Sequence, residues 1–243
     1  MTPSDIPCIP VAVRAGILAF YPFDNGSIND VSGNGHNLSN GTLAATSADR
    51  AGNPRCAFRF HNLTNPGERL LTTQTGFLDS LDQFSVSLWF KAEDSNRSGR
   101  IYEGLISRGT VTHPGSRSLS WSTGLSDCRR ATSGWMYNLW DTTTFQYNFS
   151  SSCQHKVAEN TGSWHHLVVT FEKSSGGAMS LFKDGVLHSS ITGGTAGVVT
   201  DVGNLILGEG YHGSLDDVIL YDRILSPTDV TTLHGLPACC ISQ

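Results

Sequence analysis

Short runs of alternating apolar and polar residues, separated by glycine-rich turns, are the feature that most constrains the fold. In segment 84–90 every second residue is large and apolar, which predicts a strand with one buried face. An Asp-Gly pair at 184–185 separates two apolar runs, as in a tight hairpin. Other strands are expected at 16–22, 56–60, 102–108, 118–122, 135–139, 145–149, 165–171, 179–183, 186–188, 205–207 and 215–221. This pattern predicts an all-β fold, a two-sheet antiparallel β-sandwich or jelly roll.

One short helix is expected near the C-terminus. Ser226 is a typical N-cap residue, Pro227 suits the first helical position, and the segment ends at Gly235. The 243 residues contain no internal repeat and no linker. We therefore expect a single domain over residues 16–243, preceded by an extended segment over residues 1–15.

Charge and hydropathy exclude two classes of function. The formal net charge is −5, whereas a nucleic-acid-binding surface needs a dense array of Lys and Arg. The longest apolar runs are far shorter than the roughly 20 residues that span a bilayer. We expect no nucleic-acid partner and no membrane span.

Six cysteines at wide spacing, with no C-x-x-C pair, predict structural disulfides in an oxidising compartment. Cys128 and Cys153 flank a predicted hairpin insertion and are expected to pair. Cys8 is expected to pair with one of the adjacent residues Cys239 and Cys240 if the two ends of the chain lie side by side. Cys56 then pairs with the other, and buried free thiols are the alternative.

Six N-x-S/T sequons add to the case for an extracellular protein, secreted or at the cell surface. In a source that makes N-glycans, occupied sequons must lie on the surface. The candidate glycosylation sites are Asn25, Asn37, Asn40, Asn62, Asn96 and Asn148.

The N-terminal segment has apolar residues at period two, Ile9, Val11 and Val13, and prolines that favour an extended chain. Such a segment can pair with the edge of a sheet in its own domain or in a neighbouring copy. Head-to-tail pairing between copies does not close and builds a filament. An assembly strand and a local edge strand are both open at this point.

Aromatic residues gather between residues 121 and 147, and flat aromatic rings are a common platform for sugar rings. The candidate sugar-contacting residues are Trp121, Trp135, Tyr137 and Trp140, with Phe145 and Tyr147 nearby. The alternative is a satellite core beneath an insertion.

Six segments carry a resemblance to a known family by their order and spacing. They are AFYPFD at 19–24, NDVSGNGHN at 29–37, FSVSLWFK at 84–91, WHHLVVTF at 164–171, LFKDG at 181–185 and GSLDDVILYDRILS at 213–226. The chain resembles the laminin-G-like, or concanavalin A-like, jelly-roll superfamily from about residue 17 to residue 233. Residues 109–160 depart from the usual short hairpin and are interpreted as an insertion. The resemblance implies a fold and leaves the function to the sites.

The resemblance also brings the oxygen-rich loop 30–36 beside Asp216 and Asp217. Calcium binds six to eight oxygens, and strand alternation is expected to send the two aspartates to opposite faces, so that one needs a buried partner. A structural Ca²⁺ would supply it, with the ligand set Asp30, Gly33, Asn34, His36, Asp216 and Asp217. The alternative is a metal-free Asx-turn loop and an Asp216 that accepts from backbone amides.

No catalytic constellation is found. The adjacent pair Glu93-Asp94 lacks the spacing of glycosidase carboxyls, and no nucleophile elbow or zinc helix occurs. His165 and His166 are expected on opposite strand faces, as packing residues. We predict a non-enzymatic structural or adhesive glycoprotein module, a fibre subunit joined to copies of itself or to cell-surface glycans and proteins. A calcium-stabilised carbohydrate-binding module is the alternative, and a domain associated with a glycoside hydrolase is a weaker one.

Overall fold

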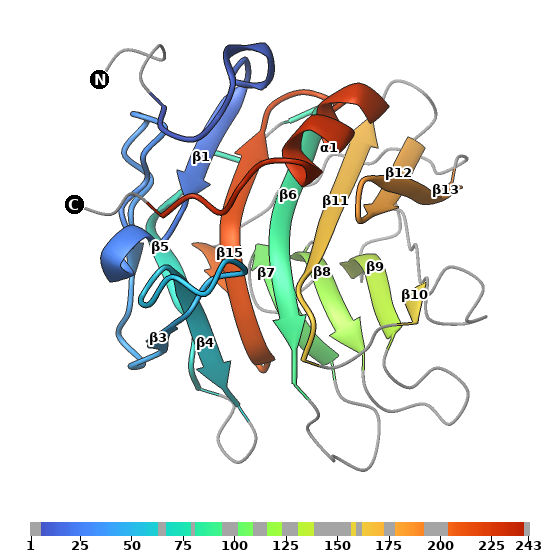
Figure 1. Cartoon of the computed structure of the whole chain (residues 1–243). Coiled ribbons are helices and arrows are strands. Elements are labelled where there is room, and N and C mark those ends of the chain that lie inside the picture. The colour runs from blue at the N-terminus through green and yellow to red at the C-terminus, as the bar shows by residue number, and fades with distance from the viewer. Residues whose placement is uncertain are drawn as a thin grey trace.

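Two β-sheets stacked face to face, with one helix on the outside, make up the fold (Figure 1). This computed structural model describes residues 6–62, 67–78, 81–93, 102–108, 116–122, 131–138, 157–158, 162–172, 178–191 and 204–240. All strand pairs in the described part of the chain are antiparallel, so the predicted sandwich is confirmed.

Sheet A has eight strands and carries the helix on its outer face. Its order is β13 (Val186–Ile191), β12 (Ala178–Lys183), β11 (His165–Glu172), β6 (Gln83–Ala92), β15 (His212–Tyr221), β4 (Ala57–His61) and β3 (Ala45–Ser47), and β1 (Ile17–Tyr21) also pairs with β15. Sheet B has seven strands in the order β10 (Val157–Ala158), β9 (Ala131–Asn138), β8 (Ser116–Ser122), β7 (Tyr102–Arg108), β14 (Asn204–Leu207), β5 (Leu70–Thr75) and β2 (Leu38–Ser39).

The segment expected to be an insertion continues sheet B through β8, β9 and β10. Most predicted strands are therefore present, with ends shifted by a few residues. The strand expected at 145–149 and the pair Cys128 and Cys153 lie outside the described residues.

The main core lies between the two sheets. The four apolar residues at alternate positions of segment 84–90 all face it, as the sequence pattern predicts. The helix α1 (Pro227–His234) has the predicted cap, since the Ser226 hydroxyl accepts from the Asp229 N–H at 3.1 Å. No helix in the described part of the chain is long and apolar enough to cross a membrane.

A second apolar cluster lies on the outer face of sheet A and includes the N-terminal segment, which was predicted to be a strand. Ile9 and Val13 are buried there against Val230 and Leu233 of α1, whereas Val11 is 77% exposed. The segment ends in a short 3-10 helix, η2 (Val11–Val13), rather than a strand. The expected strand is wrong because Ile9 and Val13, four residues apart, share one side of a turn and have partners within their own domain.

Two disulfides hold both ends of the chain on this face. Cys8 pairs with Cys239 and Cys56 pairs with Cys240, with Cα–Cα distances of 5.6 and 5.7 Å. This selects one of the pairings that the sequence left open. Each crosslink closes a long loop and is expected to stabilise the fold by about 2–5 kcal/mol. The N-terminal segment is thus covalently fixed to the C-terminal tail of its own chain.

Candidate functional site

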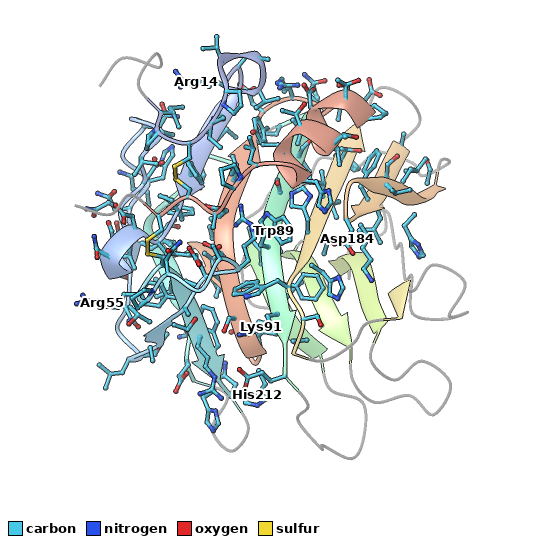
Figure 2. The ribbon with its side chains drawn as sticks, in the orientation of Figure 1. Arg14, Arg55, Trp89, Lys91, Asp184 and His212 are labelled. Atoms are coloured by element: carbon cyan, nitrogen blue, oxygen red, sulfur yellow. A yellow bond between two sulfur atoms is a disulfide. The ribbon has the colours of Figure 1, made fainter. Side chains whose placement is uncertain are left out.

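In the described part of the chain, the outer face of sheet A has a covered half and an open half. Helix α1 crosses one end of β6 and β11 in Figure 1, and the same strands continue beyond it uncovered by ribbon. Figure 2 shows Trp89 and Lys91 on this continuation, with His212 farther from the helix. We call the surface formed by the half-buried residues Trp89, Lys91, Trp164 and Arg59 the open face.

Strand alternation explains which side chains reach the open face. In β6 the residues at 84, 86, 88 and 90 face the core, so those at 85, 87, 89 and 91 face outward. Trp89 and Lys91 were not singled out as site residues from the sequence. The alternation that predicted the core already contained that signal.

Lys91 and Trp164 form one side of the open face. The Lys91 ammonium lies 5.3 Å from the centroid of the Trp164 ring, which is cation–π distance, and both residues are half-buried. No carboxylate in the described part of the chain lies within ion-pair distance of Lys91. The Lys91 charge nevertheless acts on Glu93, two residues along the chain, and helps to lower the pKa of that carboxyl.

Arg59 forms the other side, two strands away. Ser214 of β15 pairs with Lys91 on one side and with Arg59 on the other, and it is fully buried between them. Arg59 donates from Nε and Nη2 to the carboxylate of Glu93 at 2.9 and 2.7 Å, and its Nη1 bonds to none of the described residues. Burial opposes ionisation of Glu93, but these hydrogen bonds outweigh it and lower the pKa of Glu93.

Next to Trp89, Arg50 forms ion pairs with both predicted calcium-binding aspartates. Its Nη1 donates to Asp216 at 3.0 Å and to Asp217, and its Nη2 donates to the carbonyls of Leu236 and Pro237. The guanidinium also lies over the Trp89 ring, 4.4 Å from the centroid. One arginine thus joins sheet A, the C-terminal tail and the open face.

Strand alternation fails at the two aspartates, and this is a correction to the sequence analysis. Both carboxylates reach Arg50 instead of pointing to opposite faces. The register between β15 and β6 shifts between Asp216 and Ile219, and Asp217 has a φ of 44°. A bulge of this kind turns two successive side chains to one side of the sheet.

The ionisation of this pair is strongly perturbed. Burial raises the pKa of Asp216 well above its usual range, the Asp217 charge raises it further, and Arg50 opposes the shift. Burial likewise raises the pKa of Asp217 against the effect of Arg50. Two carboxylates around one guanidinium are costly to bury, so the pair depends on Arg50.

In the loop 30–36, the Asp30 carboxylate is hydrogen-bonded to backbone N–H groups. Asp30 accepts from the backbone N–H groups of Phe20, Ser32 and His36 at 2.9–3.0 Å. Asn34 donates its amide to the carbonyls of Ile17 and Leu18. The oxygens of Asp30 serve an Asx-type loop, so the predicted ligand set does not fit a calcium ion held between Asp30 and Asp216.

His166 lies beside Trp89 under α1 and is a packing residue. Its Nε2 is 2.9 Å from the Ser87 hydroxyl, and its ring is 5.2 Å from that of Trp89. Burial lowers the pKa of His166 to about 3, and the nearby His234 and Arg50 lower it as well. The adjoining cavity has a volume of about 10 Å³, room for one water molecule, so this serine–histidine contact has no space for a substrate.

Several predicted site residues lie elsewhere. Trp121, Trp135 and Tyr137 belong to β8 and β9 of sheet B, their side chains are outside the described part, and so is Trp140. The sugar contact predicted for them stays a prediction.

The sequons differ in exposure. Asn25 and Asn37 are exposed and Asn40 is half-buried, while Asn96 and Asn148 lie outside the described residues. Asn62 is fully buried, and its amide donates to the carbonyls of Glu68, Gly208 and Tyr211. Glycosylation at Asn62 is therefore incompatible with this fold, because its amide nitrogen is enclosed.

Sequence comparison finds a family match over much of the chain. Residues 65–231 match the Laminin_G_3 model, described as the concanavalin A-like lectin/glucanases superfamily. A stretch of 88 residues, 30% of this chain, is 35% identical to the sushi, von Willebrand factor type A, EGF and pentraxin domain-containing protein 1 of Rattus norvegicus. It covers 2% of that protein.

Solved structures share the fold at low sequence identity. The binding domain of Paraclostridial Mosquitocidal Protein 1 has a TM-score of 0.62 at 16% identity. The botulinum neurotoxin serotype D binding domain has a TM-score of 0.65, also at 16% identity. The matches cover 90% and 92% of this chain and 52% of each toxin domain, so the chain spans about half their length. Domain 4 of AbnA, a GH43 extracellular arabinanase from Geobacillus stearothermophilus solved with arabinotriose, has a TM-score of 0.59 at 20% identity. That match covers 90% of this chain and 98% of the arabinanase domain.

Proposed function

Because the chain belongs to the concanavalin A-like lectin/glucanase superfamily, we propose that it is a non-catalytic carbohydrate-binding domain that acts outside the cell. Its ligand contacts the open face of sheet A. Two disulfides support an oxidising compartment, as does the family.

The observation that carries this proposal is the half-buried Trp164 ring with the Lys91 ammonium 5.3 Å from its centroid. An aromatic ring offers a sugar its flat face, while Lys91 supplies hydrogen-bond donors beside the ring and Arg59 supplies another, two strands away. Such a combination of one apolar platform with a few fixed polar groups is typical of small-ligand sites.

The described acidic residues support binding over hydrolysis. Glu93 is held by Arg59 in a two-point ion pair, and Asp216 and Asp217 both bind Arg50. A glycosidase needs two carboxyls free to transfer a proton and to attack or to activate water. The carboxylates of Glu93, Asp216 and Asp217 are instead bound by arginines.

The similar structures support the same reading. Two of them are binding domains of toxins, and the arabinanase domain was solved with a bound oligosaccharide. The buried N-terminal segment removes the strand on which a fibre subunit was predicted to depend. Carbohydrate binding is thus the function that the described surface supports best.

The test is retention of the purified protein in gels that contain polysaccharides, with a panel of neutral and acidic ones. We expect the wild type to be retarded by at least one of them and Trp164→Ala to lose at least about tenfold in affinity, because stacking is lost. Trp164→Phe should keep part of the binding, and Leu187→Ala, an exposed residue on β13, serves as the matched control. Equal retention of wild type and Trp164→Ala would refute the site, and no retention by any polysaccharide would refute the function.

A further inference from the structure

We propose that His61 and His212, two histidines on neighbouring strands, bind a divalent transition-metal ion such as Zn²⁺ together with the carboxylate of Glu93. His61 ends β4, His212 begins β15 and Glu93 directly follows β6, so all three lie at one end of sheet A. Figure 2 labels His212 at this end, away from α1. The proposal goes beyond polysaccharide binding and does not depend on it.

The strand register places the two histidines side by side. His212 and His61 are directly opposite each other in the antiparallel pair of β15 and β4, so their side chains project to the same face. Their ring centroids are 4.9 Å apart. His212 is buried and thus held in place, whereas His61 is exposed, and its ring can turn about the Cα–Cβ bond to bring a nitrogen towards the ion. Two imidazoles are a ligand pair that suits Zn²⁺, Cu²⁺ and Ni²⁺.

The distance between His212 and Glu93 fits two ligands of one tetrahedral ion. The His212 Nε2 lies 3.5 Å from Oε2 of Glu93. Two ligands that are each about 2.1 Å from a tetrahedral zinc ion stand about 3.4 Å apart. The Glu93 N–H donates to the His212 carbonyl at 3.0 Å, so the backbone fixes the two residues relative to each other. An ion bound between these atoms requires little movement of either side chain.

Arg59 orients the Glu93 carboxylate without using all of its acceptor positions. Its Nε and Nη2 donate to Oε1 and Oε2 at 2.9 and 2.7 Å. A carboxylate has about four lone-pair positions, so each oxygen keeps one that this arginine does not use. Hydrogen bonds of this kind to a ligating carboxylate are common around bound metals, where they fix its orientation.

The surrounding charges do not oppose a cation. Arg59 and Lys91 contribute two positive charges, and Glu93 and Glu68 contribute two negative ones. The Glu68 carboxylate accepts from the His61 N–H at 2.6 Å, so one of these negative charges lies directly beside the site. Calcium prefers six to eight oxygens, whereas this set has two imidazoles, so a transition metal fits better.

The test is calorimetric titration of the full, untagged chain, with its disulfides intact, with ZnCl₂ and separately with CaCl₂. We expect one Zn²⁺ per chain with a dissociation constant in the micromolar range, so protein purified without added zinc is largely metal-free. His61→Ala and Glu93→Gln should each weaken binding by about tenfold or more. His188→Ala, which removes an exposed histidine from β13, is the matched control and should bind as wild type does.

Copper identifies the ligands directly. Cu²⁺ binds nitrogen and oxygen sites more tightly than Zn²⁺, so one equivalent should occupy the same site. Pulsed electron paramagnetic resonance should then show coupling to two imidazole nitrogens in the wild type and to one in His61→Ala. Because His61 is exposed, this variant is expected to keep the fold, and the change in the spectrum reports on the ligand itself.

Four results would overturn the inference. They are a wild type that binds no Zn²⁺ in the micromolar range, a His61→Ala or Glu93→Gln protein that binds as wild type does, a His188→Ala protein that loses as much affinity as His61→Ala, and Ca²⁺ that displaces Zn²⁺ at equal concentration. The first would mean that the two rings only pack against each other. None of these results bears on retention by polysaccharides, so the proposed function is tested separately.

Discussion

Replacing Arg50 with Met is the sharpest test of how this face is held together. The variant keeps an apolar stem of similar length but leaves Asp216 and Asp217 without their shared cation, in a site where Asp216 is fully buried. It also removes two hydrogen bonds to the C-terminal tail and the cation over Trp89. Breaking a buried ion pair from one side costs about 3–5 kcal/mol, so we expect the free energy of unfolding to fall by that amount.

The assay is urea denaturation at neutral pH with the disulfides intact, followed by tryptophan fluorescence. A triple variant, Arg50→Met with Asp216→Asn and Asp217→Asn, should recover most of the loss, because no charge is then left unpaired. In the same assay, calcium and EDTA should leave the wild-type stability unchanged. A loss below about 1 kcal/mol in Arg50→Met, together with a wild type that EDTA destabilises, would refute the assignment of Arg50 as the internal cation.

Three further outcomes follow from buried residues. Ile9→Ala should destabilise the domain by about 2–5 kcal/mol through cavity formation, measured by urea unfolding, and light scattering should give the same mass as wild type; a changed assembly state would restore the strand-exchange hypothesis. The pKa of His166 is lowered to about 3 in the folded protein, whereas the same side chain in the unfolded chain has its ordinary pKa near 6.5. Between these values only the unfolded chain binds the proton, so the free energy of unfolding falls as the pH falls from about 6.5 towards 3. His166→Gln should flatten that slope by up to about 1.4 kcal/mol per pH unit, and an unchanged slope would contradict the burial. When the protein is expressed in cells that make N-glycans, mass-spectrometric mapping should find Asn62 unmodified. A glycan at Asn62 on the folded protein would contradict the packing.

The strands were predictable because local patterns determine them. The alternation in segment 84–90 predicts both the strand and its buried face, and Asp184-Gly185 predicts the hairpin between β12 and β13. The cap of α1 is equally local. In each case the residues that decide the structure lie within a few positions of one another.

The site was less predictable because its contacts are distant in sequence. Arg50 is a loop residue that meets Asp216 across 166 positions, and no local signal marks it. The bulge after Asp216 breaks the period that the sequence shows, so the two carboxylates were assigned to opposite faces. Ile9 and Val13 fit period two as well as a turn, and only their partners on α1 decide between the readings.

The ends of the chain determine which part of sheet A is available to a ligand. The N-terminal segment, the C-terminal tail and α1 bury one half of the outer face in an apolar cluster, and two disulfides fix them there. Arg50 extends this attachment to the edge of the open half, since the same guanidinium that holds the tail carbonyls also lies over Trp89. His234 at the end of α1 stacks on that ring as well, with 5.6 Å between the centroids. The tail and the helix therefore position Trp89 at the border of the open face, so substitutions in the tail are expected to alter the proposed polysaccharide binding through Trp89.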